Sequence, residues 1–360
     1  MLIKCLELEN FRNHKKSVFE FSDTVTMIIG PNGAGKTNLL EAIALLSVGK
    51  AIRGGMESDL VNIDSGFARI VGVYEDSDHD EVKLEAILNK KINSNRITKT
   101  FKFNGAQKTG VQFVGQSKVV FFAPEDIRLI AGSPSRRRDF VDRILSQVHR
   151  DYHKALLKYE RVIKHRNKVL NSVKGQVLRS VHDAQLMVWD AQLLESADIV
   201  QAYRNQFFNF SDKNLKDIST NLFSKGLSLS TRYTPSHLSK ESLLRSRQRD
   251  LKYGTTQLGH HRDDYSFMLN NHQKLDLKHY GSRGQQRTGV FCMKILEEKY
   301  MVDQSKISPL LLLDDIFSEL DEDYRKSIET VISSNQTIIT SADVNSIPYG
   351  IKNNAKIITL

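Results

Sequence analysis

A glycine-rich octapeptide between an apolar segment and a helical pattern constrains the fold of this chain most strongly. Residues 25–29 form a short β-branched run typical of a buried strand. From Thr37 to Leu46 the apolar residues recur at helical spacing. The octapeptide consists of Gly30, Pro31, Asn32, Gly33, Ala34, Gly35, Lys36 and Thr37. A strand, a glycine loop and a helix in this order predict a phosphate-binding loop.

The residue types of this loop fit a nucleoside triphosphate. Its three glycines let the backbone curl so that successive N–H groups face one anion, and the helix N-terminus adds a favourable dipole. We expect Lys36 to reach the β- and γ-phosphates and Thr37 to ligate Mg²⁺. The expected cofactors are therefore ATP and Mg²⁺, with nucleotide-binding positions from Gly30 to Asn38.

A second apolar segment ends in two carboxylates. Residues 310–313 are four leucines without alternation, as expected for a parallel strand buried on both faces, and Asp314 and Asp315 follow. We expect this strand to lie beside the strand that precedes the loop, so that Asp314 reaches Mg²⁺ directly or through water. Asp315 is the candidate that polarises the attacking water. A solvated aspartate at a turn is the alternative for Asp315, because a general base is defined by geometry.

A second glycine-bearing segment, residues 282–286, precedes another helical pattern. Ser282 is a natural N-cap, and Gly284 permits close approach of the backbone to a ligand. Taken alone, a capped surface helix explains this segment equally well. Its place after the phosphate-binding loop and shortly before the acidic strand resembles the signature motif of ABC-type ATPases.

Within that class the chain resembles the RecF family of bacterial DNA-repair ATPases, which is related to SMC proteins and Rad50. The stretches that carry the resemblance are residues 8–14, 121–126, 132–138, 259–264 and 313–321. In ABC-type ATPases the signature serine and glycine contact the γ-phosphate that the opposite subunit holds. The resemblance implies Ser282, Gly284 and Gln285 as further nucleotide contacts and Lys36, Ser282 and Asp315 as catalytic residues. It also implies a dimer interface that includes Ser282, Arg283, Gly284 and Asp321.

Two departures from the wider class suggest slow turnover. The usual second acid after the acidic strand is Glu, whereas this chain has Asp315, as RecF-like chains do. Many ABC proteins carry a switch histidine after the last core strand, and this chain has Thr340 and Ser341 there. A hydroxyl can orient a γ-phosphate but cannot act as an imidazole would. The resemblance therefore implies a weak, DNA-stimulated ATPase.

The function implied by the resemblance is ATP-dependent DNA binding in recombinational gap repair. An ATP-induced dimer would clamp duplex DNA near single-strand/double-strand junctions, and slow hydrolysis would reset it. The implied partners are double-stranded and gapped DNA, a second copy of the chain, the mediators RecR and RecO and, indirectly, RecA. The implied location is the cytoplasm, at the nucleoid.

Two other classes share part of this pattern. A nucleotide-binding subunit of an ABC transporter would have both glycine segments, but such subunits are typically shorter and keep the switch histidine and the second Glu. A simple P-loop kinase or GTPase would explain Lys36 and Thr37 but would leave residues 282–286 without a role, and no Asn-Lys-x-Asp guanine motif follows.

Composition favours a polyanionic partner. The chain has 360 residues, a net charge of +10 and an isoelectric point near 9.4. Two cysteines are too few for a disulfide framework or a zinc site. The basic clusters are Arg136, Arg137 and Arg138; Lys164, His165, Arg166 and Lys168; and Arg245, Arg247, Arg249 and Lys252. Some of them are expected to contact DNA phosphates, with Arg136, Arg137 and Arg138 as the named candidates, although each cluster alone is more often a solvated helix face.

The predicted fold is α/β, with two lobes and no long coiled coil. An ABC-type ATPase lobe of residues 1–132 and 255–360 contains a mixed sheet with an antiparallel meander over residues 69–103. A mainly helical lobe of residues 133–254 is inserted in it, with one apolar stripe over residues 140–163. Residues 227–233 are expected to form a strand. His260 and His261 are expected to be a structural or interface pair, because no further metal ligands accompany them.

Overall fold

The computed structural model describes residues 1–360 except 92–95, 176–178, 221, 224–226, 271–272 and 319–321. The chain divides into two compact units. Unit 1 is discontinuous and comprises Met1–Asp126 and Phe291–Leu360, and unit 2 comprises Ile127–Val290. These boundaries differ from the predicted lobes, which change at residues 132 and 254. The second boundary lies later because the strands after residue 227 pair with one another in a sheet of unit 2.

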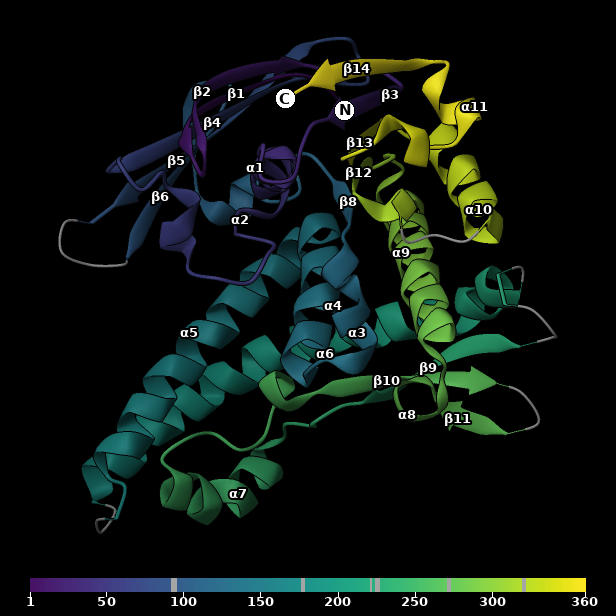
Figure 1. Cartoon of the computed structure of the whole chain (residues 1–360). Coiled ribbons are helices and arrows are strands. Elements are labelled where there is room, and N and C mark those ends of the chain that lie inside the picture. Colours follow the sequence, from purple (N-terminus) through teal and green to yellow (C-terminus); the bar gives the residue numbers. More distant parts are fainter. Residues whose placement is uncertain (92–95, 176–178, 221, 224–226, 271–272, 319–321) are drawn as a thin grey trace. The chain divides into compact units, whose positions relative to one another are not determined.

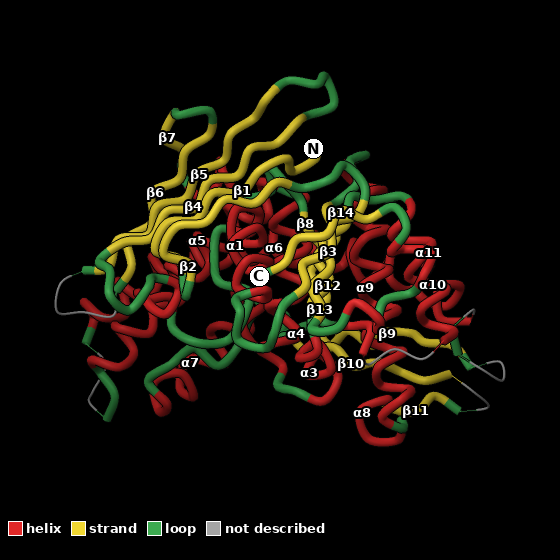
Figure 2. The backbone as a smooth tube through the Cα atoms, turned by 45° about the horizontal axis from the view of Figure 1, so that its top comes forward, coloured by secondary structure: helices red, strands yellow, loops and turns green. Residues whose placement is uncertain are grey.

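Unit 1 contains a six-stranded antiparallel sheet of order β2-β1-β4-β5-β6-β7 (Figure 2). Its strands are β1 (Leu2–Phe11), β2 (His14–Glu20), β4 (Phe67–Glu75), β5 (Glu81–Lys90), β6 (Ile97–Phe103) and β7 (Ala106–Lys108). The predicted meander is confirmed. Its last turn is at Asn104 and Gly105, which have φ of 49° and 79°, because a tight hairpin needs positive φ.

A five-stranded parallel sheet of order β14-β3-β13-β12-β8 forms the other layer of unit 1. Its strands are β3 (Val25–Ile29), β8 (Val119–Phe122), β12 (Leu310–Asp314), β13 (Thr337–Ser341) and β14 (Ala355–Thr359). The acidic strand β12 is buried along its length, as predicted. The prediction that it lies directly beside β3 is wrong, because β13 is hydrogen-bonded between the two strands.

Helix α1 (Lys36–Val48) packs between these two sheets (Figure 1). Nearly all its side chains are buried, which explains why its sequence is apolar on several faces. The core around it takes residues from both sheets, including Ile3, Leu84 and Leu312. The other elements assigned to unit 1 are η1 (Glu57–Leu60), α2 (Gly110–Phe113), η2 (Pro124–Ile127, whose last residue belongs to unit 2), η4 (Ile316–Ser318), α10 (Glu322–Ser333), η5 (Val344–Ser346) and α11 (Tyr349–Lys352).

Unit 2 combines helices with a three-stranded antiparallel sheet of order β11-β10-β9. The strands are β9 (Ser228–Thr234), β10 (Asp264–Asn270) and β11 (Lys274–Asp276), so the strand predicted at residues 227–233 is present. The helices are α3 (Arg128–Ala131), α4 (Pro134–Val148), α5 (Arg150–Ser172), α6 (Ser180–Thr220), α7 (Lys240–Tyr253), η3 (His260–Arg262) and α8 (Leu277–Tyr280). Helix α9 (Arg283–Ser305) begins in unit 2 and has its residues from Phe291 onward in unit 1.

The apolar stripe predicted over residues 140–163 belongs to two helices. His149 has extended backbone angles (φ −118°, ψ 104°), and its N–H donates to Leu145 O, which ends α4. Helix α5 begins at the next residue and packs against α6. The periodicity continues across the break because both helices bury most of the stripe: Phe140 and Ile144 on α4, and Tyr152, Leu156 and Tyr159 on α5. In the described part of the chain, no helix is both long enough and apolar enough to span a bilayer.

Candidate nucleotide-binding site

The glycine loop leaves the end of β3 and closes onto the start of α1. Gly33 and Gly35 have φ of 89° and 107°, values that L side chains rarely adopt. Gly35 is the N-cap of α1, and its carbonyl accepts the Leu39 N–H at 3.0 Å. The predicted strand–loop–helix context is therefore confirmed, with an anion-binding helix N-terminus at its end.

Lys36 lies along the inside of this loop. Its Nζ donates to the carbonyl oxygens of Gly30 at 2.6 Å and Pro31 at 3.0 Å, and its side chain is buried. These two bonds hold the ammonium group over the loop, in the position from which a phosphate-loop lysine reaches phosphate oxygens. Asn32 and Gly33 at the tip of the loop are exposed.

Side chains of the turn between β1 and β2 contact carbonyl groups of the glycine loop. Asn13 Nδ2 donates to Ala34 O at 3.2 Å, and His14 Nε2 lies 3.2 Å from Gly35 O. Asn38, predicted to contact nucleotide, donates through Nδ2 to Asn13 Oδ1 at 2.8 Å. Burial lowers the pKa of His14, which favours the neutral imidazole against this loop. The turn thus holds several loop carbonyls and fixes the loop conformation.

Arg12, in the same turn, is anchored on helix α1. Its Nε and Nη2 donate to the two carboxylate oxygens of Glu41 at 2.9 and 3.0 Å, and Glu41 is fully buried. Its Nη1 donates to Asp59 O at 3.0 Å. A bidentate pair of this kind fixes the orientation of both groups. Arg12 therefore joins the turn that contacts the loop to the helix that follows the loop.

Three hydroxyl and carboxylate groups meet at the end of β12. Asp314 Oδ1 accepts hydrogen bonds from Thr37 Oγ1 and from Thr340 Oγ1, each 2.8 Å long. Burial raises the pKa of Asp314, and the bonds from Thr340 and Thr37 oppose that rise. Although β13 separates β12 from β3, Asp314 still reaches the first turn of α1. Thr340 lies between them on β13 and links the two.

Asp315 has a left-handed backbone conformation with φ of 48°. Its N–H donates to Thr340 O at 3.1 Å and lies 3.2 Å from Thr340 Oγ1. Among residues with a side chain, Asp and Asn tolerate this region best. The backbone therefore gives a local reason for Asp rather than Glu at this position. Its side chain is partly exposed.

The second glycine segment caps helix α9 in a reciprocal pair. The Gln285 N–H donates to Ser282 Oγ at 3.2 Å, and the Ser282 N–H donates to Gln285 Oε1 at 2.9 Å. This is the geometry of a capping box, with Gln at the third helical position. The predicted N-cap is confirmed. Ser282, Arg283 and Gly284 are all exposed.

Neither the packing nor the backbone conformation around residue 284 requires a glycine there. A Cβ at this position would meet only Ser282 Oγ, at 3.9 Å, and the residue has no positive φ. A glycine in a helix costs roughly 1 kcal/mol relative to alanine. By contrast, a Cβ at Gly289 on the same helix would lie 2.5 Å from Leu277 Cδ2. Asp321, the remaining predicted interface residue, lies outside the described residues.

The structure separates the three arginines predicted to bind DNA. Arg137 is buried, and its Nε and Nη2 donate to the two oxygens of Asp264 at 2.7 and 2.9 Å. Arg138 donates to Asp263 O at 2.8 Å. Arg136 is exposed. The prediction that all three lie on one surface is therefore wrong for Arg137, which is buried and holds helix α4 to strand β10. A DNA contact of Arg136 and Arg138 stays a prediction.

The adjacent histidines are structural, as predicted. His260 is buried, with Nε2 2.7 Å from Ala197 O and Nδ1 3.3 Å from Asp263 Oδ2. His261 Nδ1 lies 2.9 Å from Tyr159 Oη. Among the described residues, no group of three or more His, Cys, Asp and Glu side chains is placed to hold a metal ion. A divalent cation at Asp314 would therefore take most of its ligands from phosphate and water oxygens.

Sequence reasoning missed the contacts of Asn13 and Glu41 with the loop and its helix. Residues 8–14 carried the resemblance, but nothing in the spacing of Asn13 indicates which carbonyls it contacts. Glu41 gave a usable signal, since a single acid within an otherwise apolar helix is expected to have a partner. The role of Thr340 in binding Asp314 depends on strand order, which the sequence did not reveal.

Comparison with known proteins places the chain in a family. A family model described as RecF/RecN/SMC N terminal domain matches residues 2–354. The DNA replication and repair protein RecF of Caldanaerobacter subterraneus subsp. tengcongensis is 34% identical over an alignment of 353 positions that covers 94% of each chain. RecF of Bacillus cereus is 34% identical over an alignment of 375 positions that covers 99% of this chain and 96% of the relative.

Solved structures agree with this placement. A structure described as the recombination mediator protein RecF with ATP in the RecFOR pathway has a TM-score of 0.85 and 32% identity, and covers 96% of this chain and 93% of that one. The Smc head domain of Pyrococcus furiosus has a TM-score of 0.55 at 18% identity and covers 99% of this chain and 93% of that one, which shows a shared fold alone. The predicted α/β fold is confirmed, and the chain belongs to the RecF family of DNA replication and repair proteins within the RecF/RecN/SMC group.

Proposed function

We propose that this chain is an ATP-dependent DNA-binding protein of recombinational gap repair. Two copies form a dimer when ATP binds. The observation that carries the proposal is the convergence of Lys36, Thr37 and Asp314 at the glycine loop. A lysine held inside a phosphate loop beside a hydroxyl–carboxylate pair is the arrangement that binds a nucleoside triphosphate with its metal. Relatives with the same overall fold include a RecF structure with ATP.

The residues at Asp314 fit Mg²⁺. Thr37 Oγ1 and Asp314 Oδ1 lie 2.8 Å apart, and hydroxyl and carboxylate oxygens are ligands that Mg²⁺ accepts together with phosphate and water oxygens. Thr37 and Asp314 would hold the ion, which neutralises charge on the phosphate oxygens. Thr340 orients Asp314 through its own hydrogen bond.

In the proposed hydrolysis, one residue of the chain stabilises the developing negative charge and another activates water. Lys36 would donate from Nζ to phosphate oxygens in place of the Gly30 and Pro31 carbonyls, and so stabilise the charge that develops during phosphoryl transfer. Asp315 would orient the attacking water and accept its proton. An aspartate is one bond shorter than glutamate, which is consistent with a slow, resetting reaction.

The signature segment supports a site shared between two copies. Ser282 Oγ accepts a hydrogen bond in the capping box, so its O–H proton is available for donation to a phosphate oxygen. Gly284 leaves open space where its own chain does not need it, which suits the close approach of a ligand that a second copy holds. We infer that Ser282, Arg283 and Gly284 of one copy close on ATP at Lys36 of the other.

The family supplies the proposed role of that dimer. RecF relatives are DNA replication and repair proteins and recombination mediators of a pathway named after RecF, RecO and RecR. We propose that the ATP-bound dimer holds duplex DNA near single-strand/double-strand junctions and, with RecO and RecR, helps RecA to load. The net charge of +10 supports a phosphate-rich partner. No observation favours the transporter alternative.

Sizing of the purified chain by light scattering, with and without ATP-Mg²⁺ and a gapped duplex, tests the proposal. We expect a monomer that becomes a dimer with ATP. Lys36→Met should lose nucleotide binding, dimerisation and DNA retention together, whereas Ser282→Arg should keep ATP binding and lose only dimerisation and DNA retention. A dimer shift that persists in Ser282→Arg would refute the shared site.

A further inference from the structure

Helix α5 of unit 2 is strongly basic, and its neighbour α6 is acidic. Helix α5 carries seven Lys and Arg residues and two Asp and Glu residues, whereas α6 carries three and six. Arg166 of α5 is buried and bonds to Asp190 and Asp250, so it contributes no surface charge. The remaining imbalance is concentrated on the exposed side of α5.

Three cations of α5 lie on one face. Arg161, Lys164 and Lys168 follow one another at steps of three and four residues and are exposed, opposite the buried positions Tyr159 and Arg166. Among the described residues, none of these three cations forms an ion pair with an acidic side chain. Glu160 lines the same face, so three cations and one carboxylate leave a net charge of +2 there.

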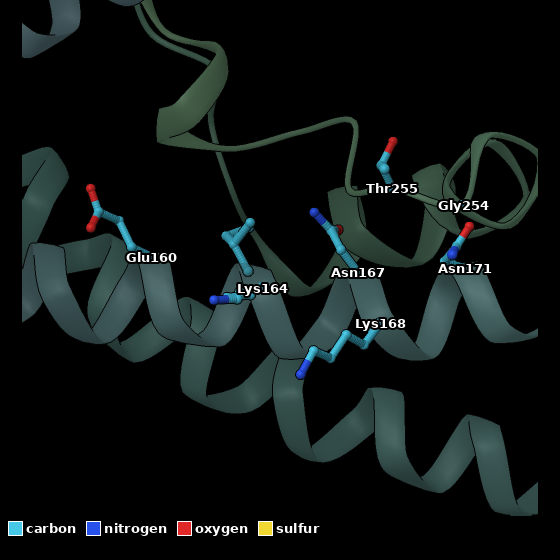
Figure 3. Close-up of a pocket in the computed structure, with 8 residues that line it drawn as sticks. Glu160, Lys164, Asn167, Lys168, Asn171, Gly254 and Thr255 are labelled. Carbon is cyan, nitrogen blue, oxygen red and sulfur yellow. The ribbon is translucent and has the colours of Figure 1, made fainter. Parts of the chain in front are cut away.

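The same face is hollowed. Two shallow pockets lie side by side on it and share the lining residues Glu160, Lys164 and Lys168. Arg161 and His165 line the first pocket alone. The second pocket continues to Gly254 and Thr255, which follow α7 (Figure 3). Figure 3 shows Lys164 and Lys168 extending from the same side of α5, one turn apart. We call the residues Arg161, Lys164, Lys168, Asn167 and Thr255 the α5 groove.

The polar wall of the α5 groove is held in place. Asn167 Oδ1 accepts from the Thr256 N–H at 2.8 Å and from Thr256 Oγ1 at 2.7 Å, which ties the α5 side of the groove to the segment after α7. Gly254 caps α7 with a φ of 73°, and its N–H donates to Asp250 O. The groove thus combines exposed cationic head groups with an amide that is held by hydrogen bonds.

We propose that the α5 groove binds the phosphate backbone of duplex DNA, an inference that rests on the DNA-binding function proposed above. Steps of three and four residues advance a helix by about 4.5 and 6 Å, while phosphates of one strand rise about 3.4 Å along the duplex axis. From Arg161 to Lys168 the helix advances by about 10 Å, a length that spans about three phosphate rises of one strand, so the three long side chains can reach different phosphates of that strand. Cations, amides and hydroxyls that contact phosphates carry no base preference, so binding here is independent of sequence.

Other anionic partners fit the α5 groove less well. A lipid surface requires an apolar face to insert, and on this face Leu157, 39% exposed, is the large hydrophobic residue available within the described helix. An acidic protein surface would satisfy the charge but would leave DNA affinity independent of these residues. That difference gives the test its second outcome.

The test compares the DNA affinity of the triple variant Arg161→Ala/Lys164→Ala/Lys168→Ala with that of the natural chain. Fluorescence anisotropy of a labelled gapped duplex measures both affinities. ATP-Mg²⁺ is present, and salt is varied. The plot of log affinity against log salt should lose about 0.9 of slope for each phosphate contact removed. ATP affinity and the ATP-driven dimer should be unchanged. Lys213→Ala/Lys216→Ala, which removes two exposed cations of α6, should leave the slope as it is.

A charge-preserving variant, Lys164→Arg/Lys168→Arg, separates charge from folding and should keep the salt slope of the natural chain. If the triple variant keeps both slope and affinity while ATP still drives dimerisation, the α5 groove is not a DNA contact, and the proposed function stands. If the natural chain with ATP-Mg²⁺ does not retain the duplex at all, both the inference and the proposed function fail.

Discussion

Thr37 Oγ1 donates a 2.8 Å hydrogen bond to Asp314 Oδ1, although 277 positions separate the two residues in the sequence. Helix α1 and strand β12 meet at this bond, so the two residues that we propose as Mg²⁺ ligands, one in the loop and one at the end of the strand, form one unit. Thr340, on the strand between them, donates to the same oxygen at 2.8 Å. Asp314 therefore has its orientation fixed from two elements before any nucleotide binds.

Thr340→Val should slow ATP hydrolysis while leaving ATP affinity within about twofold. Valine has nearly the same shape, but it removes the hydroxyl that orients Asp314, and a hydrogen bond to a charged group contributes roughly 1.5–3 kcal/mol. We expect a fall in kcat of about ten-fold or more. Steady-state ATPase assays that separate kcat from KM measure this. Thr340→Ser retains the hydroxyl and should remain close to the natural rate; equal loss in both variants would show that packing, not the hydrogen bond, matters.

Gly284→Ala should make the chain more stable and less able to dimerise. A Cβ at Gly284 meets only Ser282 Oγ at 3.9 Å, and replacing glycine by alanine at an unstrained position stabilises by about 0.4–1 kcal/mol. The same methyl group would occupy space that we assign to ATP held by the second copy. Urea unfolding followed by Trp189 fluorescence, together with light scattering in ATP-Mg²⁺, measures both effects.

Gly289→Ala is the matched control on the same helix. Its Cβ would lie 2.5 Å from Leu277 Cδ2 and 3.0 Å from Ile130 Cδ1, so overpacking should cost about 1–3 kcal/mol. The two alanines should therefore shift the unfolding midpoint in opposite directions. An ATP-driven dimer of natural affinity in Gly284→Ala would remove the argument that this glycine serves the partner.

Arg12→Ala should destabilise unit 1 and weaken nucleotide binding together. Glu41 is fully buried and Arg12 supplies both hydrogen bonds to its carboxylate, so removing Arg12 leaves a buried charge without its partner. Such a loss typically costs about 3–5 kcal/mol. Chemical unfolding measured by circular dichroism should show the loss, and ATP titration should show weaker binding because the turn that contacts the loop is released.

The double variant Arg12→Ala/Glu41→Leu isolates the cause. An apolar side chain at position 41 removes the charge that Arg12→Ala leaves behind, so the double variant should be more stable than Arg12→Ala alone. If the two variants are equally unstable, the effect comes from the lost contact of Arg12 with Asp59 O or from packing, and the ion pair is not responsible.

Local signals predicted the nucleotide loop well because everything that builds it is contiguous. Strand β3 and the start of α1 were read from residues 25–46, and Ser282 was read as an N-cap from its type and position. Strand order is not local. The insertion of β13 between β3 and β12 depends on which apolar strands pair, and neighbouring strands such as β12 and β13 are alike in burial.

Charge was the least informative signal in the sequence. Arg136 and Arg137 are identical and adjacent, yet one is exposed and the other is buried against Asp264. The same holds for Arg166, which is buried, and Lys168, which is exposed. Which arginine finds an acid depends on the helical phase and on strands more than a hundred residues away. A basic cluster therefore predicts a surface only after burial is known.

Unit 2 should become less stable as pH falls from about 6.5 to about 4, in part through His261. Burial lowers the pKa of His261 to about 4, from 6.5, and its nitrogens lie 2.9 Å from Tyr159 Oη and 3.0 Å from Thr256 O. Between these two pKa values the imidazole is protonated in the unfolded chain and neutral in the folded chain, so the free energy of unfolding rises with pH. One such group contributes a slope of at most about 1.4 kcal/mol per pH unit.

The variant His261→Gln isolates that contribution. Glutamine cannot titrate, so the free energy of unfolding should depend less steeply on pH between about 4.5 and 6.5 than in the natural chain. Burial also lowers the pKa of His14 and of His149, and these groups remain in both proteins, so the difference between the two slopes belongs to His261. Asp263 acts at lower pH: burial raises its pKa, but the hydrogen bond with His260 and the charge of Arg204 hold it below the usual 3.8. Its contribution is lost only as pH falls below that value.

Urea titrations followed by Trp189 fluorescence at several pH values give the slope for the natural chain and for His261→Gln. Equal slopes would show that His261 is protonated to the same extent in the folded and unfolded chains.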